Sequence, residues 1–228
     1  MLREYQQRTI DQLYKWFADG HKGHPCIELP TGSGKSHIIA AVCQDAKMQW
    51  PDTRILMLTH VKELIEQNAE KLRQHWPEVP LGIYSAGLGS KRFDDITFGS
   101  IQSIRRVDPA QLGHFDLVLI DEAHLIPGNS STMYRRFLDA LKCINPALKV
   151  IGLTATPFRT GGGMLHEGKD ALFTDIAYEA PVRELIDAGY LSPLVSKQPA
   201  TRLDVSKVGT RAGDFIARDL AAAVDQEA

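Results

Sequence analysis

A glycine-rich turn that ends in a lysine and a serine is the part of this sequence with the clearest chemistry. Residues 29–36 read Leu-Pro-Thr-Gly-Ser-Gly-Lys-Ser and stand between an apolar stretch at 26–29 and a helix-type segment at 37–48. Such a turn directs several backbone N–H groups at one point, and the following helix adds the positive end of its dipole there. Lys35 would reach the outer phosphates of a nucleotide, and the Ser36 hydroxyl would ligate Mg²⁺. The turn therefore predicts a nucleoside triphosphate site.

The turn lacks one residue of the full phosphate-loop pattern, which has a glycine five positions before Gly34. Leu29 occupies that position. The simpler interpretation is a surface turn that caps an ordinary helix. A preceding strand and a following helix are the context that a phosphate loop requires, and the sequence predicts both.

Two adjacent carboxylates supply the second half of such a site. Asp121 and Glu122 follow the aliphatic run at 115–120, which is typical of a strand buried on both faces of a parallel sheet. Asp121 would hold Mg²⁺ through its water shell, and Glu122 would orient and polarise the attacking water. The alternative for an isolated Asp-Glu pair is a solvated strand end. Together with the upstream turn, the pair predicts a Mg-nucleotide site.

Strands and helices alternate along the chain in a way that would position these residues. Apolar runs predict strands at 54–59, 81–84, 96–98, 115–120 and 149–154, and helical spacing predicts helices at 5–18, 61–76 and 132–144. This alternation indicates βαβ units around a parallel sheet. Ligands of such sheets bind at the carboxyl ends of the strands, where Ser36, Asp121 and Thr154 would lie.

The pattern becomes less regular after Pro157. The glycine-rich residues 159–163 predict a hinge or lid, residues 181–189 a short helix, residues from 193 a linker, and residues 214–228 an alanine-rich helix. The boundary that we predict divides the chain into a domain at 1–192 and a tail at 193–228. The helix at 132–144 is expected to face the core with an apolar stripe: Met133, Phe137, Leu138, Leu141 and Ile144.

Composition is that of an ordinary globular protein, with 43% hydrophobic and 24% charged residues among 228. Three scattered cysteines, with no leader and no run long enough to span a bilayer, favour a cytoplasmic location without a membrane partner. The net charge of −2 gives no indication of nucleic-acid binding. His21, His24 and Cys26 match no standard zinc spacing, so we expect no metal there. Nothing in the sequence indicates an oligomeric state.

Segments in the expected order resemble the motifs of superfamily 2 helicases and translocases. In that family the first position of the phosphate loop is commonly not glycine, which accounts for Leu29, and residues 121–124 have the Asp-Glu-Ala-His (DEAH) form of motif II. The other resembling segments are 2–6 (the adenine-reading element), 59–64 (motif Ia), 98–103 (motif Ib) and 152–157 (motif III). Within the superfamily, the chain looks most like the bacterial RadD-type DNA-repair ATPases, on segments 60–63, 98–103, 152–159, 171–173 and 189–191.

This resemblance implies a RecA-like P-loop NTPase fold, a three-layer α/β sandwich with a mainly parallel sheet that binds ATP and Mg²⁺. Lys35, Asp121 and Glu122 would be catalytic, with Ser36 and Asp121 at the metal. Gln6 would read the adenine edge. The other residues implied at the nucleotide are Arg3, Thr31, Gly32, Ser33 and Gly34.

The resemblance also implies two further groups of residues. His124, Thr154 and Thr156 would couple the state of the nucleotide to the rest of the protein. The track for nucleic acid, with DNA favoured over RNA, would include Thr59, His60, Lys62, Gly99, Ser100 and Gln102. These would grip phosphates without reading the base sequence.

Superfamily 2 motors have a second RecA-like lobe, which supplies an arginine finger. No segment after Thr160 resembles the motifs of that lobe, so we expect residues 1–192 to be the first lobe and residues 193–228 to be a linker and helix that lead toward a second lobe absent from this chain. The function that we expect is ATP hydrolysis that drives movement on DNA or its remodelling, in repair or recombination. The alternatives are the motor portion of a restriction-type nuclease and a non-motor, ATP-gated clamp on nucleic acid.

Overall fold

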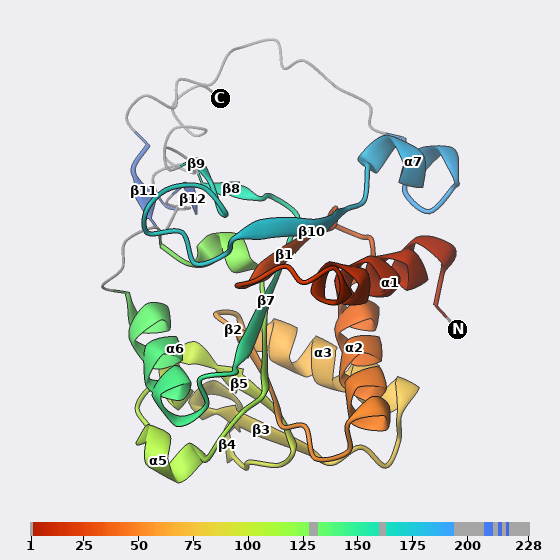
Figure 1. The fold of residues 1–228 in the computed structure, drawn as a ribbon. Coiled ribbons are helices and arrows are strands. Elements are labelled where there is room, and N and C mark those ends of the chain that lie inside the picture. The colour runs from red at the N-terminus through yellow and green to blue at the C-terminus, as the bar shows by residue number, and fades with distance from the viewer. Residues whose placement is uncertain are drawn as a thin grey trace.

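The computed structural model describes residues 2–127, 132–159, 163–193, 208–211, 214–215 and 218. Its centre is an eight-stranded sheet in which every neighbouring pair is parallel except the last, β3 with β4. The sheet confirms the predicted α/β fold with a mainly parallel sheet (Figure 1). In spatial order the strands are β10 (Asp175–Glu179), β1 (Pro25–Glu28), β7 (Lys149–Thr154), β6 (Leu117–Asp121), β2 (Ile55–Thr59), β5 (Ile96–Ser100), β3 (Leu81–Ser85) and β4 (Ser90–Lys91).

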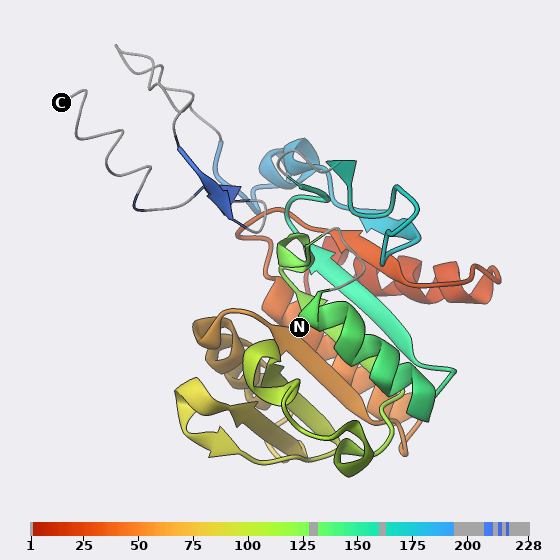
Figure 2. The same cartoon turned by 90° about the vertical axis from the view of Figure 1, so that its left-hand side faces the viewer.

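Helices cover both faces of the sheet and form two separate apolar cores with it (Figures 1 and 2). One core contains side chains of α1 (Glu4–Ala18), α2 (Lys35–Gln49), α3 (Lys62–His75) and α7 (Val182–Asp187). The other contains side chains of α4 (Ile101–Ile104), α5 (Pro109–Leu112) and α6 (Met133–Ile144). Successive residues of β6 alternate between the cores, with Leu119 in the first and Val118 and Ile120 in the second.

The predicted apolar face of α6 is correct in its middle and wrong at its ends. Phe137, Leu138 and Leu141 are buried, but Met133 and Ile144 are 39% and 38% exposed. Tyr134 is buried instead, because positions 134, 137, 138 and 141 follow the 3, 4 and 7 spacing of a single helical face. The two terminal residues extend past the area that the sheet covers.

The predicted helix at 214–228 is wrong at its first two residues. Asp214–Phe215 is a short strand, β12, which pairs antiparallel with β11 (Thr210–Arg211). Residues 212–213 and 216–217 lie outside the described residues. Residues 219–228 also lie outside them.

The short strands on either side of the predicted hinge at 159–163 pair with each other. Phe158–Arg159 (β8) pairs antiparallel with Gly163–Met164 (β9), and residues 160–162 lie outside the described part of the chain. Residues Ala86–Leu88 form a short 3-10 helix between β3 and β4. Among the described residues, no helix has the length and apolar character needed to cross a bilayer.

Candidate nucleotide site

The glycine-rich turn connects β1 to α2 at the carboxyl edge of the sheet. Gly34 stands directly before α2 in the left-handed conformation, with φ of 77°. A Cβ atom at this position would lie 2.8 Å from Nε2 of Gln6, so conformation and space both require glycine here. The turn is thus held tightly at the point where the backbone N–H groups of α2 become available.

The phosphate-loop residues and the two acids line a single cavity of about 320 Å³. The Nζ atom of Lys35 lies 3.6 Å from Oε1 of Glu122, and both side chains are largely buried. Parallel pairing of β6 with β7, and of β7 with β1, brings the acids to the turn. The residues that line the cavity are Thr31, Gly32, Gly34, Lys35, Ser36, His37, Leu64, Gln67, Lys71, Asp121 and Glu122.

Asp121 is the last residue of β6 and is only 3% exposed. Its Oδ1 accepts a hydrogen bond from the backbone N–H of Glu122 at 3.0 Å, and its Oδ2 accepts one from Nδ2 of Asn68 at 2.9 Å. Burial raises the pKa of Asp121, and the bond from Asn68 opposes that rise. A buried carboxylate and the Ser36 hydroxyl in one cavity are hard oxygen donors of the kind that Mg²⁺ prefers, so the residues fit this ion.

The sequence prediction missed Asn68. It lies on α3 between Ile65 and Leu72, which are buried, and it is buried itself. An amide at a position where the helical period calls for an apolar residue was the available signal. Buried amides require partners, and the nearby carboxylate is that partner.

Glu122 has an unusual backbone. Its φ of 53° is the only positive φ among the described residues other than glycine. This conformation ends β6 and begins the short 3-10 helix Ala123–Leu125. Oε2 of Glu122 lies 3.4 Å from Nδ1 of His124. Strain at such a residue is typical of functional sites.

The predicted coupling residues form one hydrogen-bonded group. Nδ1 of His124 lies 2.8 Å from Oγ1 of Thr154. The Thr154 hydroxyl donates to the carbonyl oxygen of Thr156 and accepts from the Thr156 N–H, at 3.0 and 3.1 Å. Nδ1 of His124 and the backbone of Thr156 therefore both meet at the Thr154 hydroxyl. The group therefore connects β7 to the loop that carries Glu122.

The two residues predicted at the adenine are already engaged within the protein. Oε1 of Gln6 accepts from the N–H of Arg3, and its Nε2 donates to the carbonyl oxygen of Ser33, both at 3.0 Å. Tyr5 also donates its hydroxyl to that carbonyl. The guanidinium of Arg3 lies over the ring of Tyr190 at 5.1 Å. Gln6 thus connects α1 to the phosphate loop, and its Nε2 also donates to the hydroxyl oxygen of Tyr5 at 3.4 Å.

The predicted nucleic-acid residues meet at the carboxyl ends of β2 and β5, which pair Leu58 with Gly99 and Thr59 with Ser100. Ser100 donates its hydroxyl to Gln102, and Nε2 of Gln102 donates to the carbonyl oxygen of His60 at 3.3 Å. Their exposure differs: the Lys62 side chain is 54% exposed, whereas Thr59 is buried and its hydroxyl accepts from the Val61 N–H. Thr59 therefore shapes this edge from within.

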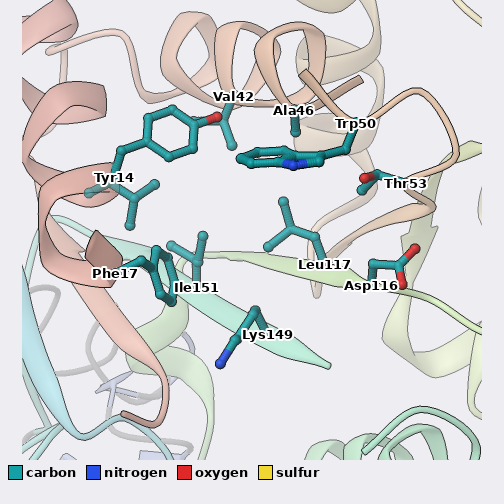
Figure 3. A pocket seen from close by; sticks show the side chains of 11 residues that line it. Tyr14, Phe17, Val42, Ala46, Trp50, Thr53, Asp116, Leu117, Lys149 and Ile151 are labelled. Carbon is teal, nitrogen blue, oxygen red and sulfur yellow. The ribbon is translucent and has the colours of Figure 1, made fainter. Parts of the chain in front are cut away.

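A second cavity, of about 300 Å³, lies at the opposite edge of the sheet (Figure 3). Apolar and aromatic side chains of α1 and α2, including Tyr14, Phe17 and Trp50, surround it together with the first residues of β6 and β7. It contains no glycine-rich turn and faces away from the acids, so it does not compete as a triphosphate site.

His21 and His24 contact other parts of the protein, and Cys26 is buried. The His21 ring stacks on Trp16, Nδ1 of His24 accepts from the Val150 N–H, and burial raises the pKa of Cys26 to about 12. In the described part of the chain, no group of three or more His, Cys, Asp or Glu side chains has the arrangement of a metal site.

Residues 1–159 match the family described as "Type III restriction enzyme, res subunit". The chain belongs to this family. It is the first lobe of a superfamily 2 helicase-type ATPase, as the motifs and the sheet indicated.

Curated proteins that are similar to this chain are named as ATP-dependent helicases. The protein IRC3 of Saccharomyces cerevisiae, named as an ATP-dependent helicase, is 29% identical over 227 residues, which cover 94% of this chain and 31% of IRC3. The ATP-dependent RNA helicase DHX58 of Mus musculus is 28% identical over 62% of the chain and 24% of its own length. The chain thus spans less than a third of either relative.

Solved structures share its fold. The UvsW helicase of bacteriophage T4 matches with a TM-score of 0.55 and 18% identity, over 77% of this chain and 59% of that one. The Sulfolobus solfataricus SWI2/SNF2 ATPase core, in complex with dsDNA, matches with a TM-score of 0.54 and 22% identity, over 75% and 34%. These likenesses confirm the RecA-like arrangement of a mainly parallel sheet.

Proposed function

We propose that this chain is the ATP-binding lobe of a nucleic-acid-dependent ATPase that uses hydrolysis to move on DNA or to remodel it. The observation that carries the proposal is the cavity in which Lys35, Ser36, Asp121 and Glu122 come together. Family membership and the names of the relatives agree with it.

The site residues would act on a bound nucleotide as follows. Backbone N–H groups from Thr31 to Ser36, with Lys35, would hold the phosphates. Ser36 and Asp121 would hold Mg²⁺, which supplies charge neutralisation at the phosphates when bound. Glu122 would orient the attacking water and accept its proton. The contact of Lys35 with Glu122 would give way to contacts with phosphate, which frees the carboxylate for this role.

The proposed lobe comprises residues 1–192, and residues 193–228 would lead toward a second lobe. Tyr190 supports this boundary, because its ring lies 5.0 Å from that of Tyr5, whose hydroxyl bonds the phosphate loop. Arg8 of α1 also pairs with Glu184 of α7 at 2.7 Å. The segment up to residue 191 therefore packs against α1 and the turn.

The proposed nucleic-acid track follows the carboxyl ends of β2 and β5. His60, Lys62, Gly99, Ser100 and Gln102 would offer backbone and side-chain donors to phosphates. We favour DNA because two neighbours of the same fold were solved with DNA, the SWI2/SNF2 core and a nuclease-deletion mutant of the restriction-modification enzyme LlaGI with a substrate mimic. A role in DNA repair and a cytoplasmic location belong to the same proposal.

The substitution Lys35→Ala tests the nucleotide site directly. The variant should lose binding of a fluorescent ATP analogue at least tenfold, because the ammonium group of Lys35 is the one expected to contact the outer phosphates. Its circular dichroism and melting temperature should match those of the unchanged chain. Lys91→Ala is the matched control, since Lys91 is exposed on β4. Equal affinity in both variants would reject the site.

A second candidate function, the motor portion of a restriction-type nuclease, is favoured by the description of the family itself. Both candidate functions assign the same role to this lobe, and they differ only in whether a nuclease accompanies it in the complete protein. Cleavage of DNA by the complete protein under ATP hydrolysis would support the second, whereas displacement or sliding without cleavage would support the first.

A further inference from the structure

Asn68 makes the one side-chain hydrogen bond that Asp121 receives in the described part of the molecule. Its Nδ2 donates to Oδ2 of Asp121 at 2.9 Å, and the sulfur of Met57 lies 4.0 Å away on the other side. Asp121 faces α3 because it lies two residues after Leu119 on the same face of β6, and Leu119 belongs to the core formed with α1, α2 and α3. The contact thus fixes the carboxylate from the helix that forms one wall of the cavity.

The other end of the same amide has no partner. Oδ1 of Asn68 is buried and makes no hydrogen bond. Leaving a buried polar atom unpaired is costly, and an apolar side chain at this position of α3 would avoid that cost. Leu64 and Gln67, both adjacent on α3, line the nucleotide cavity. Asn68 itself is not among the residues that line the cavity, so it acts on the site through Asp121.

We propose that Asn68 is a positioning residue for the magnesium site, which orients the Asp121 carboxylate through Nδ2. The inference rests on the proposed function, because it concerns the same Mg-nucleotide site. It adds a residue outside the motifs that predicted the site.

The geometry explains why such a residue is needed. A carboxylate at a strand end can rotate about its last bond, and a metal site requires one orientation. The Glu122 N–H holds Oδ1 and Asn68 holds Oδ2, so the two bonds together fix the plane of the carboxylate. Each oxygen retains a lone pair for a ligand. Residues that orient metal ligands in this way commonly change metal affinity 10- to 100-fold when they are substituted.

The substitution Asn68→Leu tests the proposal, because leucine has a similar volume and removes both polar atoms. We would titrate a fluorescent ATP analogue first in EDTA and then at increasing Mg²⁺. The affinity in EDTA should stay within about twofold, while the Mg²⁺ concentration for half-maximal effect should rise at least tenfold. An unchanged Mg²⁺ midpoint would overturn the proposal.

Leu72→Ala is the control for a purely structural role. Leu72 is buried on the same helix, one turn beyond Asn68, and its truncation should lower the melting temperature without moving the Mg²⁺ midpoint. If Leu72→Ala moves the midpoint as much as Asn68→Leu, the effect is one of stability, and the proposal fails.

A measurement on the unchanged chain covers the case in which Asn68→Leu does not fold. The side-chain amide resonances of Asn68 should shift when Mg²⁺ is added to the nucleotide-bound protein, and their constancy would contradict the proposal. Failure of the unchanged chain to bind nucleotide at all would instead reject the proposed function. The two failures are therefore distinguishable.

Discussion

Glu122 illustrates how one residue combines strain and chemistry. Its positive φ places a side chain with a Cβ atom in a conformation that favours glycine. This conformation places the carboxylate between Lys35 and His124, in the cavity where water would be activated. Such a position is selected for its chemistry at the expense of stability.

Two substitutions at this residue separate the strain from the charge. Glu122→Gln removes the charge and keeps the strained backbone, whereas Glu122→Gly removes both. We expect Glu122→Gly to be more stable than Glu122→Gln by about 0.5–1 kcal/mol in denaturant unfolding. Both variants should bind nucleotide and lose single-turnover hydrolysis about 10²- to 10⁴-fold. Equal stability would show that the backbone is unstrained, and retained hydrolysis would exclude Glu122 as the base.

At the scale of elements, β7 is tightly packed at Gly152, where Phe173 and Ala123 lie against the strand. A Cβ atom on Gly152 would lie 2.5 Å from the ring of Phe173 and 3.0 Å from Cβ of Ala123. Gly152→Ala should therefore destabilise the protein by about 1–3 kcal/mol, because the buried Phe173 ring must shift. Gly87→Ala is the control, since its nearest neighbour, Cδ of Lys62, is 3.6 Å away.

The contact itself can be tested by a double substitution. Phe173→Leu frees space over Gly152, so the combined variant should be less destabilised than the sum of the two single variants, with a coupling of about 1 kcal/mol. Urea unfolding of all four proteins gives this value. Simple additivity would mean that the ring of Phe173 is not what opposes the new methyl group.

His24 accepts a hydrogen bond from β7, and it should make the stability of the folded chain depend on pH. Burial, with help from Lys142, Lys149 and Arg135, lowers the pKa of His24 to about 4. Its Nδ1 must stay unprotonated to accept from the Val150 N–H. Because the folded pKa is below the unfolded value, the unfolded chain binds the proton first, and stability present above about pH 6.5 is lost as the pH falls toward 4.

His24→Asn provides the comparison, since its Oδ1 can accept the same hydrogen bond without titrating. The unchanged chain should lose of the order of 1–2 kcal/mol more than His24→Asn between pH 7 and pH 4.5, after allowance for the partial exposure of the ring. Urea unfolding at the two pH values measures the difference. Parallel losses in both proteins would place the pH dependence elsewhere.

Sequence patterns predicted the parts of these elements that depend on local periodicity. The aliphatic strand ending at Asp121, the strand at 149–154 and the helix after Gly34 agree with the structure within a few residues. Patterns did not predict β10, whose residues Asp175–Glu179 have charged ends and only partial burial, or the inward amide of Asn68. These depend on partners distant in the chain, such as the Trp16 indole that donates to Asp175.

At the scale of the whole molecule, the parallel order of β1, β7 and β6 brings residues about 90 positions apart into one cavity. The prediction that the turn and the acids meet needed only the rule that such ligands bind at carboxyl strand ends. Which side chains support the acids could not be predicted, because that depends on where α3 crosses β6. The five proposed nucleic-acid residues lie at the same carboxyl edge of the sheet as the buried Thr59.

The composition of the cavity leads to a prediction about turnover by this chain. Its lining includes Lys35 and Lys71 but no arginine from the described residues. Arg3, which is near the turn, lies over Tyr190. Phosphoryl transfer in this class of site depends on an arginine that stabilises the transition state and contributes about 10³- to 10⁵-fold to the rate. We therefore expect the 228-residue chain to bind nucleotide but to hydrolyse it slowly and to unwind nothing.

A steady-state ATPase assay with and without DNA, alongside binding of the fluorescent analogue, measures this directly. Binding with a turnover that DNA barely changes is the expected result, because the proposed track and cavity would be present without the arginine. Robust DNA-stimulated hydrolysis would mean that a group of this chain supplies the missing charge, for which Arg3 would be the first residue to substitute. Slow turnover by the Arg3→Ala variant alone would then identify it, whereas equal turnover would direct attention to the residues after 193.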